Sequence, residues 1–208
     1  MKQQIYPTAR DLAIFRHVGQ RGISSTAAIH RAFWAGRQLQ TAQDRLDHLA
    51  TAGYLTHQVM VRRGQAHHVY TLGRKAAALF SEAERRDFLL RPAAGELGHL
   101  LRTGEVVDWL RATRQVTSFI HEHALRSAIR QGARRGLADA QITLDGIQTL
   151  LEIDSIHYTG QRLRQKVTEL GQADRPVLWV VGSQARLKAV SQVASGQTNI
   201  QVVRYGTD

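Results

Sequence analysis

The sequence lacks cysteine altogether and has only three prolines among its 208 residues. Without cysteine there can be no disulfide, thiol nucleophile or cysteine-ligated zinc or iron–sulfur centre, so any metal must be held by carboxylates or by the ten histidines. Long apolar runs are also missing: residues 176–182 are typical of the longest, whereas roughly 20 are needed to span a bilayer. Since no apolar segment follows the polar first residues either, we expect a soluble, cytoplasmic protein without a membrane partner.

Lysine is scarce, yet the chain is strongly basic. Its 28 cations exceed its 17 acids by 11, and arginine supplies 24 of them. Arginine carries a planar fork of donors that suits phosphate groups. A nucleic acid is therefore the leading expected partner, while an anionic membrane surface or an acidic protein would also fit the charge. The excess is larger in residues 1–90, at +7, than in residues 91–208, at +4.

The hydrophobic period predicts two domains, residues 1–90 and 91–208. In the first, a helix begins after Thr8, a second after Ser24 or Ser25, and a third covers residues 37–52. The period then becomes two, which predicts strands over residues 54–61 and 66–72 around an arginine-bearing turn, with a helix over residues 73–84 behind them. Three helices followed by a basic hairpin is the order of a winged helix-turn-helix domain.

The second domain has the pattern of a mixed α/β fold. Helices are expected over residues 95–113 and 117–135, and His121-Glu-His123 within the latter is interpreted as surface. Asp145-Gly146 predicts a two-residue hairpin turn between strands over residues 138–144 and 147–154. A helix over residues 158–171, a strand over 177–181, a helix capped by Ser183 and a strand over 199–205 complete it. The fold class is therefore α/β (α+β), with a mixed sheet covered on both faces.

The third helix is the expected recognition helix for double-stranded DNA. Its apolar residues are spaced at three and four, which predicts one buried stripe of Leu39, Ala42, Leu46 and Leu49. The residue types left on its open sides can pair with base edges and phosphates: Arg37, Gln38, Gln40, Thr41, Asp44, Arg45 and His48. Arg62 and Arg63 at the hairpin tip are expected along the DNA backbone or in the minor groove. An ordinary solvated helix face is the alternative.

An acidic cluster is predicted in the second domain. A two-residue turn at 145–146 pairs residues whose numbers sum to 291, so Asp139 lies opposite Glu152, and Asp154 shares their face. Crowded carboxylates favour a hard cation such as Mg²⁺ or Mn²⁺ between them. Lys166 from the following helix would approach the cluster and stabilise a phosphoryl transition state.

Glu105 or, as the weaker choice, Asp108 is the expected fourth acid of this cluster. The alternative is that these carboxylates are simply solvated at strand ends.

The ordered motifs resemble those of the replication-relaxation family of plasmids and integrative elements, which includes mobilisation C-type relaxases. They are Thr8-Ala-Arg-Asp-Leu-Ala-Ile, Thr41-Ala-Gln-Asp-Arg-Leu, Ala52-Gly-Tyr-Leu, Val69-Tyr-Thr-Leu, His99-Leu-Leu, Ala138-Asp-Ala, Leu151-Glu-Ile-Asp154, Lys166 and Val180-Val-Gly-Ser-Gln-Ala-Arg186. The resemblance implies a restriction-endonuclease-like second domain, with Asp139 as the first strand acid and Glu152 as the central glutamate. Asp154 occupies the usual lysine position of such nucleases, so Lys166 would take that role. Ser155-Ile-His157 departs from the family's usual Arg-Gly-Thr.

Three functions follow as hypotheses. The leading one is a site-specific double-stranded DNA-binding protein that acts in replication or conjugative mobilisation of a mobile element, alongside other DNA-transfer or replication proteins. The second is a Mg²⁺- or Mn²⁺-dependent DNA nickase that uses Asp139, Glu152, Asp154 and Lys166, with the three acids as metal ligands. The third is a transcriptional regulator whose nuclease-like domain is inactive and assembles homodimers.

Overall fold

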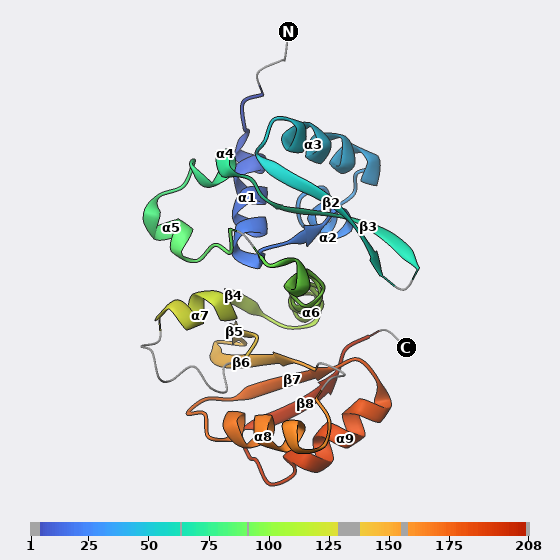
Figure 1. Cartoon of the computed structure of the whole chain (residues 1–208), viewed down its shortest axis with the longest axis vertical. Helices are drawn as coiled ribbons and strands as arrows, with labels where there is room; N and C mark the ends of the chain where they lie inside the picture. Colours follow the sequence, from blue (N-terminus) through green and yellow to red (C-terminus); the bar gives the residue numbers. More distant parts are fainter. Residues whose placement is uncertain (1–4, 63, 91, 129–137, 155–157, 207–208) are drawn as a thin grey trace. The chain divides into compact units, whose positions relative to one another are not determined.

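The computed structural model describes residues 5–62, 64–90, 92–128, 138–154 and 158–206 (Figure 1). The chain divides into two compact units, residues 1–104 and 105–208. This division falls within helix α6 (Leu97–Thr113), further along the chain than the predicted boundary near residue 91. None of the helices in the described ranges is long and apolar enough to cross a bilayer.

The first unit contains short helices and a three-stranded antiparallel sheet in the order β1-β3-β2 (Figure 1). Its elements are α1 (Ala9–Arg21), β1 (Ser24–Ser25), α2 (Thr26–Phe33), α3 (Leu39–Thr51), β2 (Leu55–Arg62), β3 (Gln65–Leu72), α4 (Arg74–Ala77), α5 (Glu82–Arg86) and the 3₁₀ turn η1 (Ala94–Glu96). The predicted order of three helices and a hairpin is confirmed. The predicted single helix over residues 73–84 is wrong, because Ser81 and Glu84 form a capping box that begins a separate helix, α5.

Side-chain caps explain where the first two helices begin. The Thr8 hydroxyl accepts a hydrogen bond from the backbone N–H of Asp11, and the Asp11 carboxylate accepts one from the Thr8 N–H, which completes a capping box. Ser25 caps α2 in the simpler way, by accepting from the N–H of Ala28. Each cap satisfies N–H groups that a helix cannot pair internally. The predicted starts of both helices are therefore confirmed.

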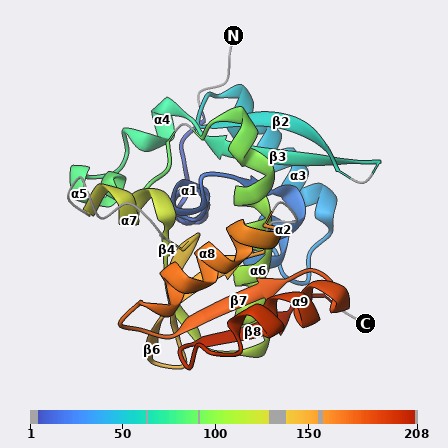
Figure 2. The same ribbon diagram turned by 60° about the horizontal axis from the view of Figure 1, so that its bottom comes forward.

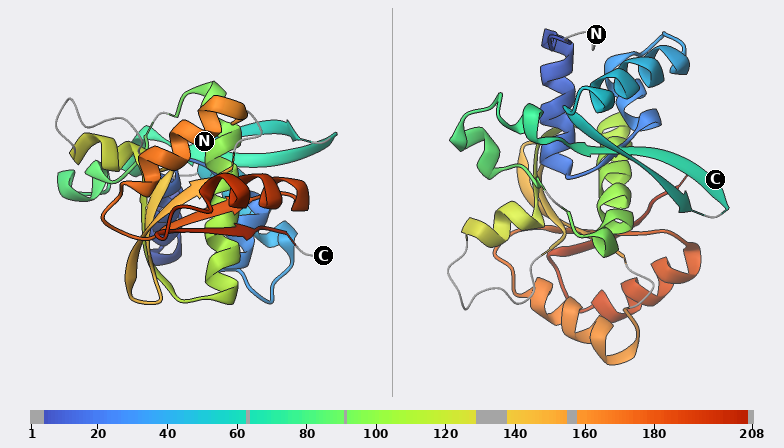
Figure 3. Two further views of the ribbon diagram at one scale, coloured as in Figure 1. Left: turned by 90° about the horizontal axis from the view of Figure 1, so that it is seen from below. Right: turned by 45° about the horizontal axis from the view of Figure 1, so that its top comes forward.

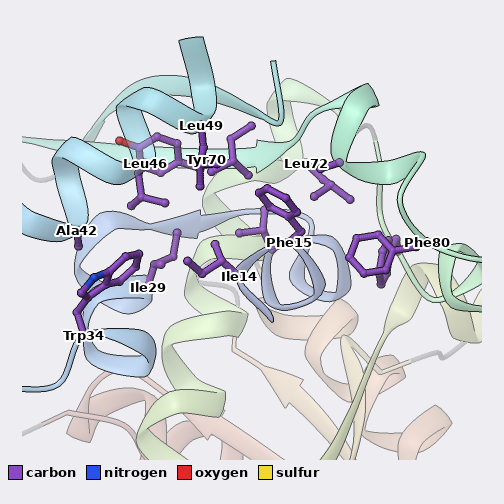
Figure 4. Close-up of a cluster of buried hydrophobic side chains, with 14 residues drawn as sticks. Ile14, Phe15, Ile29, Trp34, Ala42, Leu46, Leu49, Tyr70, Leu72 and Phe80 are labelled. Carbon is purple, nitrogen blue, oxygen red and sulfur yellow. The ribbon is translucent and has the colours of Figure 1, made fainter. Parts of the chain in front are cut away.

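A continuous core joins the helices of the first unit to its sheet (Figure 4). Its fully buried members come from α1, α2, α3, β3 and α4: Ile14, Phe15, Val18, Ile29, Ala42, Leu46, Leu49, Tyr70 and Ala76. Three of the four residues predicted as the buried stripe of α3 lie in this core. Leu39 does not, because it is the first residue of the helix and its exposed fraction is 49%. The predicted burial of Leu39 is wrong.

The second unit is a five-stranded mixed sheet in the order β4-β5-β6-β7-β8. Its elements are β4 (Val116–His121), α7 (Glu122–Ala128), β5 (Ala140–Leu144), β6 (Ile147–Ile153), α8 (Gly160–Gly171), β7 (Val177–Val181), α9 (Gln184–Ala194) and β8 (Ile200–Arg204). The first three strands are antiparallel, and β6, β7 and β8 run parallel. A mixed α/β class with two sheets is therefore confirmed.

The predicted helix over residues 117–135 is wrong at its start. Residues 116–121 form β4, which pairs antiparallel with β5, and α7 covers only Glu122–Ala128 of the described residues. The run Val-Thr-Ser-Phe-Ile is rich in β-branched and aromatic residues, which favour a pleated strand. His121 ends the strand and is buried, so its predicted surface position is wrong too.

The turn between β5 and β6 sets the register predicted from the sequence. Asp145 and Gly146 both have positive φ, 49° and 83°, as a two-residue turn of this kind requires. Five pairs from Ala140–Leu151 to Leu144–Ile147 obey the sum of 291. Helices α8 and α9 lie side by side on one face of β7 and β8 (Figure 2), and α6 packs on the other through Val106, Val107 and Leu110.

Candidate nucleic-acid interface and acidic site

Most of the residues predicted to contact DNA lie exposed around the start of α3. Arg37 and Gln38 precede the helix, with Gln38 at its N-cap position, while Gln40, Thr41 and His48 lie on the helix itself. All five are exposed, and the Gln40 amide donates a hydrogen bond to Asp44 Oδ1 over 2.7 Å. An exposed row of amide, hydroxyl, imidazole and guanidinium groups can pair with base edges and phosphates.

Arg45, also predicted to contact DNA, has a partner inside the first unit. Its guanidinium makes two hydrogen bonds to the Asp11 carboxylate, Nε to Oδ1 at 3.1 Å and Nη2 to Oδ2 at 2.5 Å. The Asp11 side chain is 1% exposed, and the pair ties α3 to the beginning of α1. Burial works to raise the pKa of Asp11, but the hydrogen bonds from Arg45 and Thr8 outweigh it and hold the pKa below its ordinary value. Arg45 is thus part of the internal structure of this unit.

The β2–β3 hairpin places its arginine-bearing tip at the end remote from α4 (Figures 1 and 3). Arg62 is half-buried at the end of β2, and Arg63 lies outside the described residues. Sequence reasoning missed a histidine pair on this hairpin: His57 Nε2 lies 2.9 Å from His68 Nδ1, and the two rings are parallel. In the observed register His57 lies opposite Tyr70 and His68 opposite Val59, so the two histidines are diagonal neighbours on one face. The two predicted strands alone did not pair them, because no register was predicted for this hairpin.

The predicted acidic cluster forms around Glu152, which is fully buried on β6. Asp139 precedes β5 opposite it, and its Oδ2 accepts a hydrogen bond from the Ile153 N–H at 2.6 Å. Burial, followed by the charge of Asp139, raises the pKa of Glu152 well above its ordinary value. The predicted closeness of Asp139 and Glu152 is therefore what the structure shows.

Lys166 approaches Glu152 from α8. Its Nζ lies 3.2 Å from Glu152 Oε2, which is an ion pair by distance. Neither Glu152 oxygen makes a well-formed hydrogen bond to a described residue, so the attraction between the two charges is the main link between Lys166 and Glu152. Tyr158 lies beside this pair, where burial and then the charges of Glu152 and Asp139 raise the pKa of its phenol. The phenol is therefore a hydrogen-bond donor at neutral pH, as an ordinary tyrosine is, and it keeps its proton to higher pH.

Asp154 is engaged elsewhere. Both of its oxygens accept hydrogen bonds from Arg186 on α9, from Nε at 2.7 Å and from Nη2 at 2.6 Å. The Asp154 side chain is 2% exposed, and the same guanidinium also donates to the Tyr158 carbonyl at 3.0 Å. Because a bidentate arginine occupies both oxygens, Asp154 has an internal structural partner.

The fourth acid of the cluster is Glu122, the first residue of α7. Burial raises the pKa of Glu152 most, and the charges of Asp139 and, less strongly, Glu122 raise it further, whereas Lys166 lowers it. The backbone N–H of Glu122 donates to the Asp139 carbonyl at 2.9 Å. The predicted candidates, Glu105 and Asp108, lie on α6, which covers the other face of the sheet. That expectation is wrong. The sequence predicted one helix over residues 117–135, whereas β4 ends at His121 and Glu122 follows it directly as the start of α7.

The donor set of Asp139 and Glu152 fits a hard divalent cation, and Glu122 is a further carboxylate whose charge acts on Glu152. Two buried carboxylate oxygens of Glu152 without hydrogen-bond geometry are the kind of donor that Mg²⁺ or Mn²⁺ accepts. Asp154 does not fit, since Arg186 holds both of its oxygens. Among the described residues, no three acidic or histidine side chains are placed as ligands of one metal ion. Metal binding therefore stays a prediction.

A scan of protein-family models and a search of curated proteins find no match to this chain. The resemblance to the replication-relaxation family therefore stays a prediction, supported by motif order alone.

Proposed function

We propose that this chain is a site-specific double-stranded DNA-binding protein that acts in replication or conjugative mobilisation of a mobile element. In this proposal the first unit is a winged helix-turn-helix domain, α3 is its recognition helix and the β2–β3 hairpin is its wing. The second unit is a restriction-endonuclease-like domain. Other DNA-transfer or replication proteins are its expected partners.

The exposed polar face of α3 is the observation that carries this proposal. Gln38, Gln40, Thr41 and His48 are exposed, while Ala42, Leu46 and Leu49 of the same helix are buried. A helix held by one apolar face and open on the other can enter a major groove, where glutamine pairs bidentately with adenine.

Charge gives independent support. The chain carries a formal charge of +11, and most of its cations are arginines. Arg62 lies near the tip of a hairpin that follows the proposed recognition helix, where a wing would meet the DNA backbone. Such a charge favours association with a polyanion and makes binding depend on salt.

The first experiment selects a preferred duplex from a random library and then measures binding by fluorescence anisotropy over a range of salt concentrations. Gln40→Ala should weaken binding to the selected duplex by about 1–3 kcal/mol and leave scrambled DNA nearly unaffected. The double variant Arg62→Ala, Arg63→Ala should weaken binding to the selected and to the scrambled duplex alike. It should also reduce the slope of log affinity against log salt concentration by about one unit per lost phosphate contact.

Arg86→Ala is the matched control, because the Arg86 side chain is 75% exposed on α5, away from α3 and the hairpin tip. The proposal is overturned if the selection enriches no duplex sequence. It is also overturned if the Arg62→Ala, Arg63→Ala variant and the Arg86→Ala control show the same salt slope.

A second function is favoured by one specific observation, the buried Glu152 carboxylate beside Asp139 and Lys166. In this alternative the protein nicks DNA. Asp139 and Glu152 would hold Mg²⁺ or Mn²⁺, which when bound supplies positive charge against a phosphate group. Lys166 would hold its ammonium towards the same phosphate, and Tyr158 would donate a hydrogen bond from its protonated phenol.

A nicking assay on supercoiled DNA that carries the selected site, with Mg²⁺ or Mn²⁺, tests this alternative. Asp139→Asn and Glu152→Gln remove charge with little change of volume, and Glu169→Gln, at a half-buried residue of α8 whose partner is Gln165, is the control. Nicking by the wild type and the control but by neither site variant would support the nickase. Nicking by all of them would exclude the site.

If the wild type binds DNA but does not nick it, the nickase is excluded and DNA binding remains. That result favours the third hypothesis, a transcriptional regulator. The ion pairs of Lys166 and Arg186 with Glu152 and Asp154 favour that outcome, because the site already holds its own cations. Repression of a reporter without any other transfer protein would then identify the regulator.

A further inference from the structure

We propose that a cavity in the first unit binds a small organic carboxylate with a compact apolar body. This site goes beyond the proposed function and does not depend on it. The cavity has a volume of about 280 Å³ and lies between β2, β3, the start of α4 and the side chains of Leu90, Pro92 and Leu97. A single water occupies only about 10–15 Å³. The space therefore suits only a small organic molecule, since its volume is just below the roughly 300 Å³ at which typical ligand pockets begin.

One wall of the cavity is polar and comes from the hairpin. Thr56 and Thr71 are directly opposite each other on β2 and β3, and Gln58 shares their face of the sheet. Thr71 is only 8% exposed. Within the described part of the chain, these three side chains make no hydrogen bond to another group, so the wall offers two hydroxyls and an amide to a ligand.

Arg74 supplies the charge. It is exposed at the start of α4, and it is the one charged residue among the described residues that line this cavity. Lys75 beside it points elsewhere, since its Nζ donates to the Ala52 carbonyl at 2.7 Å. The Arg74 guanidinium makes no ion pair with any described residue. A free guanidinium beside hydroxyl and amide donors pairs well with a carboxylate.

The remaining wall is apolar and selects the rest of the ligand. Leu90, Pro92 and Leu97 line it, and Leu90 is 37% exposed although it is a large apolar side chain. Burying an apolar ligand body against these residues removes their surface from water. A phosphate would bring more charge than one arginine neutralises and would place it against this apolar wall at a cost in solvation. A carboxylate on a compact apolar body matches both walls.

Benzoate is the probe, and benzamide is its neutral counterpart of nearly the same shape. Amide spectra of the full ¹⁵N-labelled chain are recorded during titration of each. Benzoate should bind saturably with a dissociation constant of about 1 mM, as expected for so small a ligand, and should shift the amides of Thr56, Gln58 and Thr71. Benzamide should bind at least about tenfold more weakly, since it lacks the charge.

Arg74→Gln should weaken benzoate binding at least about tenfold and leave benzamide unchanged, whereas Arg86→Gln, which removes an exposed arginine outside the cavity, should bind as the wild type does. The same spectra check that each variant is folded. The proposal is overturned if benzoate, cyclohexanecarboxylate and hexanoate all leave these amides unshifted at about 10 mM, above the range expected for such ligands. Equal binding of benzoate and benzamide, or of wild type and Arg74→Gln, would overturn it as well.

Discussion

The ion pair between Arg45 and Asp11 allows a sharp test, because the sequence alone assigned Arg45 to DNA. Arg45→Met keeps an apolar stem in place and removes both charge-assisted hydrogen bonds, which leaves the buried Asp11 carboxylate with only its two bonds from Thr8, at 2.7 and 2.8 Å. Breaking a fully buried pair costs about 3–5 kcal/mol. Since the Arg45 side chain is 28% exposed and water can partly replace it, we expect a loss of about 2 kcal/mol.

The measurement is urea unfolding, followed through NMR signals of the first unit, for the wild type, Arg45→Met, Asp11→Asn and the double variant. Asp11→Asn should cost about 2–3 kcal/mol, because it weakens the cap as well as the pair. The double variant should show a coupling free energy of about 1–2 kcal/mol. A loss below about 0.5 kcal/mol for Arg45→Met, or no coupling, would refute a structural role for the pair.

The same pair predicts a pH dependence. Asp11 has a lowered pKa in the folded state, so its contribution is complete above the ordinary aspartate pKa of about 3.9 and is lost as the pH falls through the folded value. Arg45→Met should therefore lose less stability on acidification than the wild type. If the proposed DNA binding holds, the folded variant should keep its sequence preference, whereas Gln40→Ala should not.

Three further predictions concern stability. Leu46→Ala should cost about 2–5 kcal/mol in urea unfolding and Leu39→Ala less than about 0.5 kcal/mol, since their exposed fractions are 0% and 49%; equal losses would contradict the core described above. Gly73→Ala should cost about 2–3 kcal/mol, because its Cβ would lie 2.6 and 2.7 Å from two backbone oxygens, and a loss no larger than that of Gly95→Ala, which faces open space, would exclude this contact. The pKa of Glu152 is raised in the folded state, so the free energy of unfolding of the wild type should fall as the pH rises from about 4.3 towards the folded-state pKa. Glu152→Gln should reduce this dependence of stability on pH. Parallel stability–pH profiles for the two proteins would refute the prediction.

Local patterns predicted several parts of the fold correctly. The caps at Thr8 and Ser25 depend only on residues three positions apart, and the turn at 145–146 depends on two residues that accept positive φ. This two-residue turn fixes the pairing of β5 and β6. The sequence by itself therefore determined that Asp139 and Glu152 lie close together.

Other parts depended on partners far apart in the sequence. Nothing near Arg45 marks it as the partner of Asp11, 34 residues earlier, and nothing near Asp154 marks Arg186, 32 residues later. Strand β4 was missed because it lies at the edge of the sheet, and whether such a segment forms a strand depends on backbone hydrogen bonds to its neighbour β5. Glu122, which follows β4 directly, was missed for the same reason. The local sequence determines the charge of each side chain and the preference of the backbone. Which charges neutralise each other depends on packing, because only the tertiary structure brings those groups within hydrogen-bond distance.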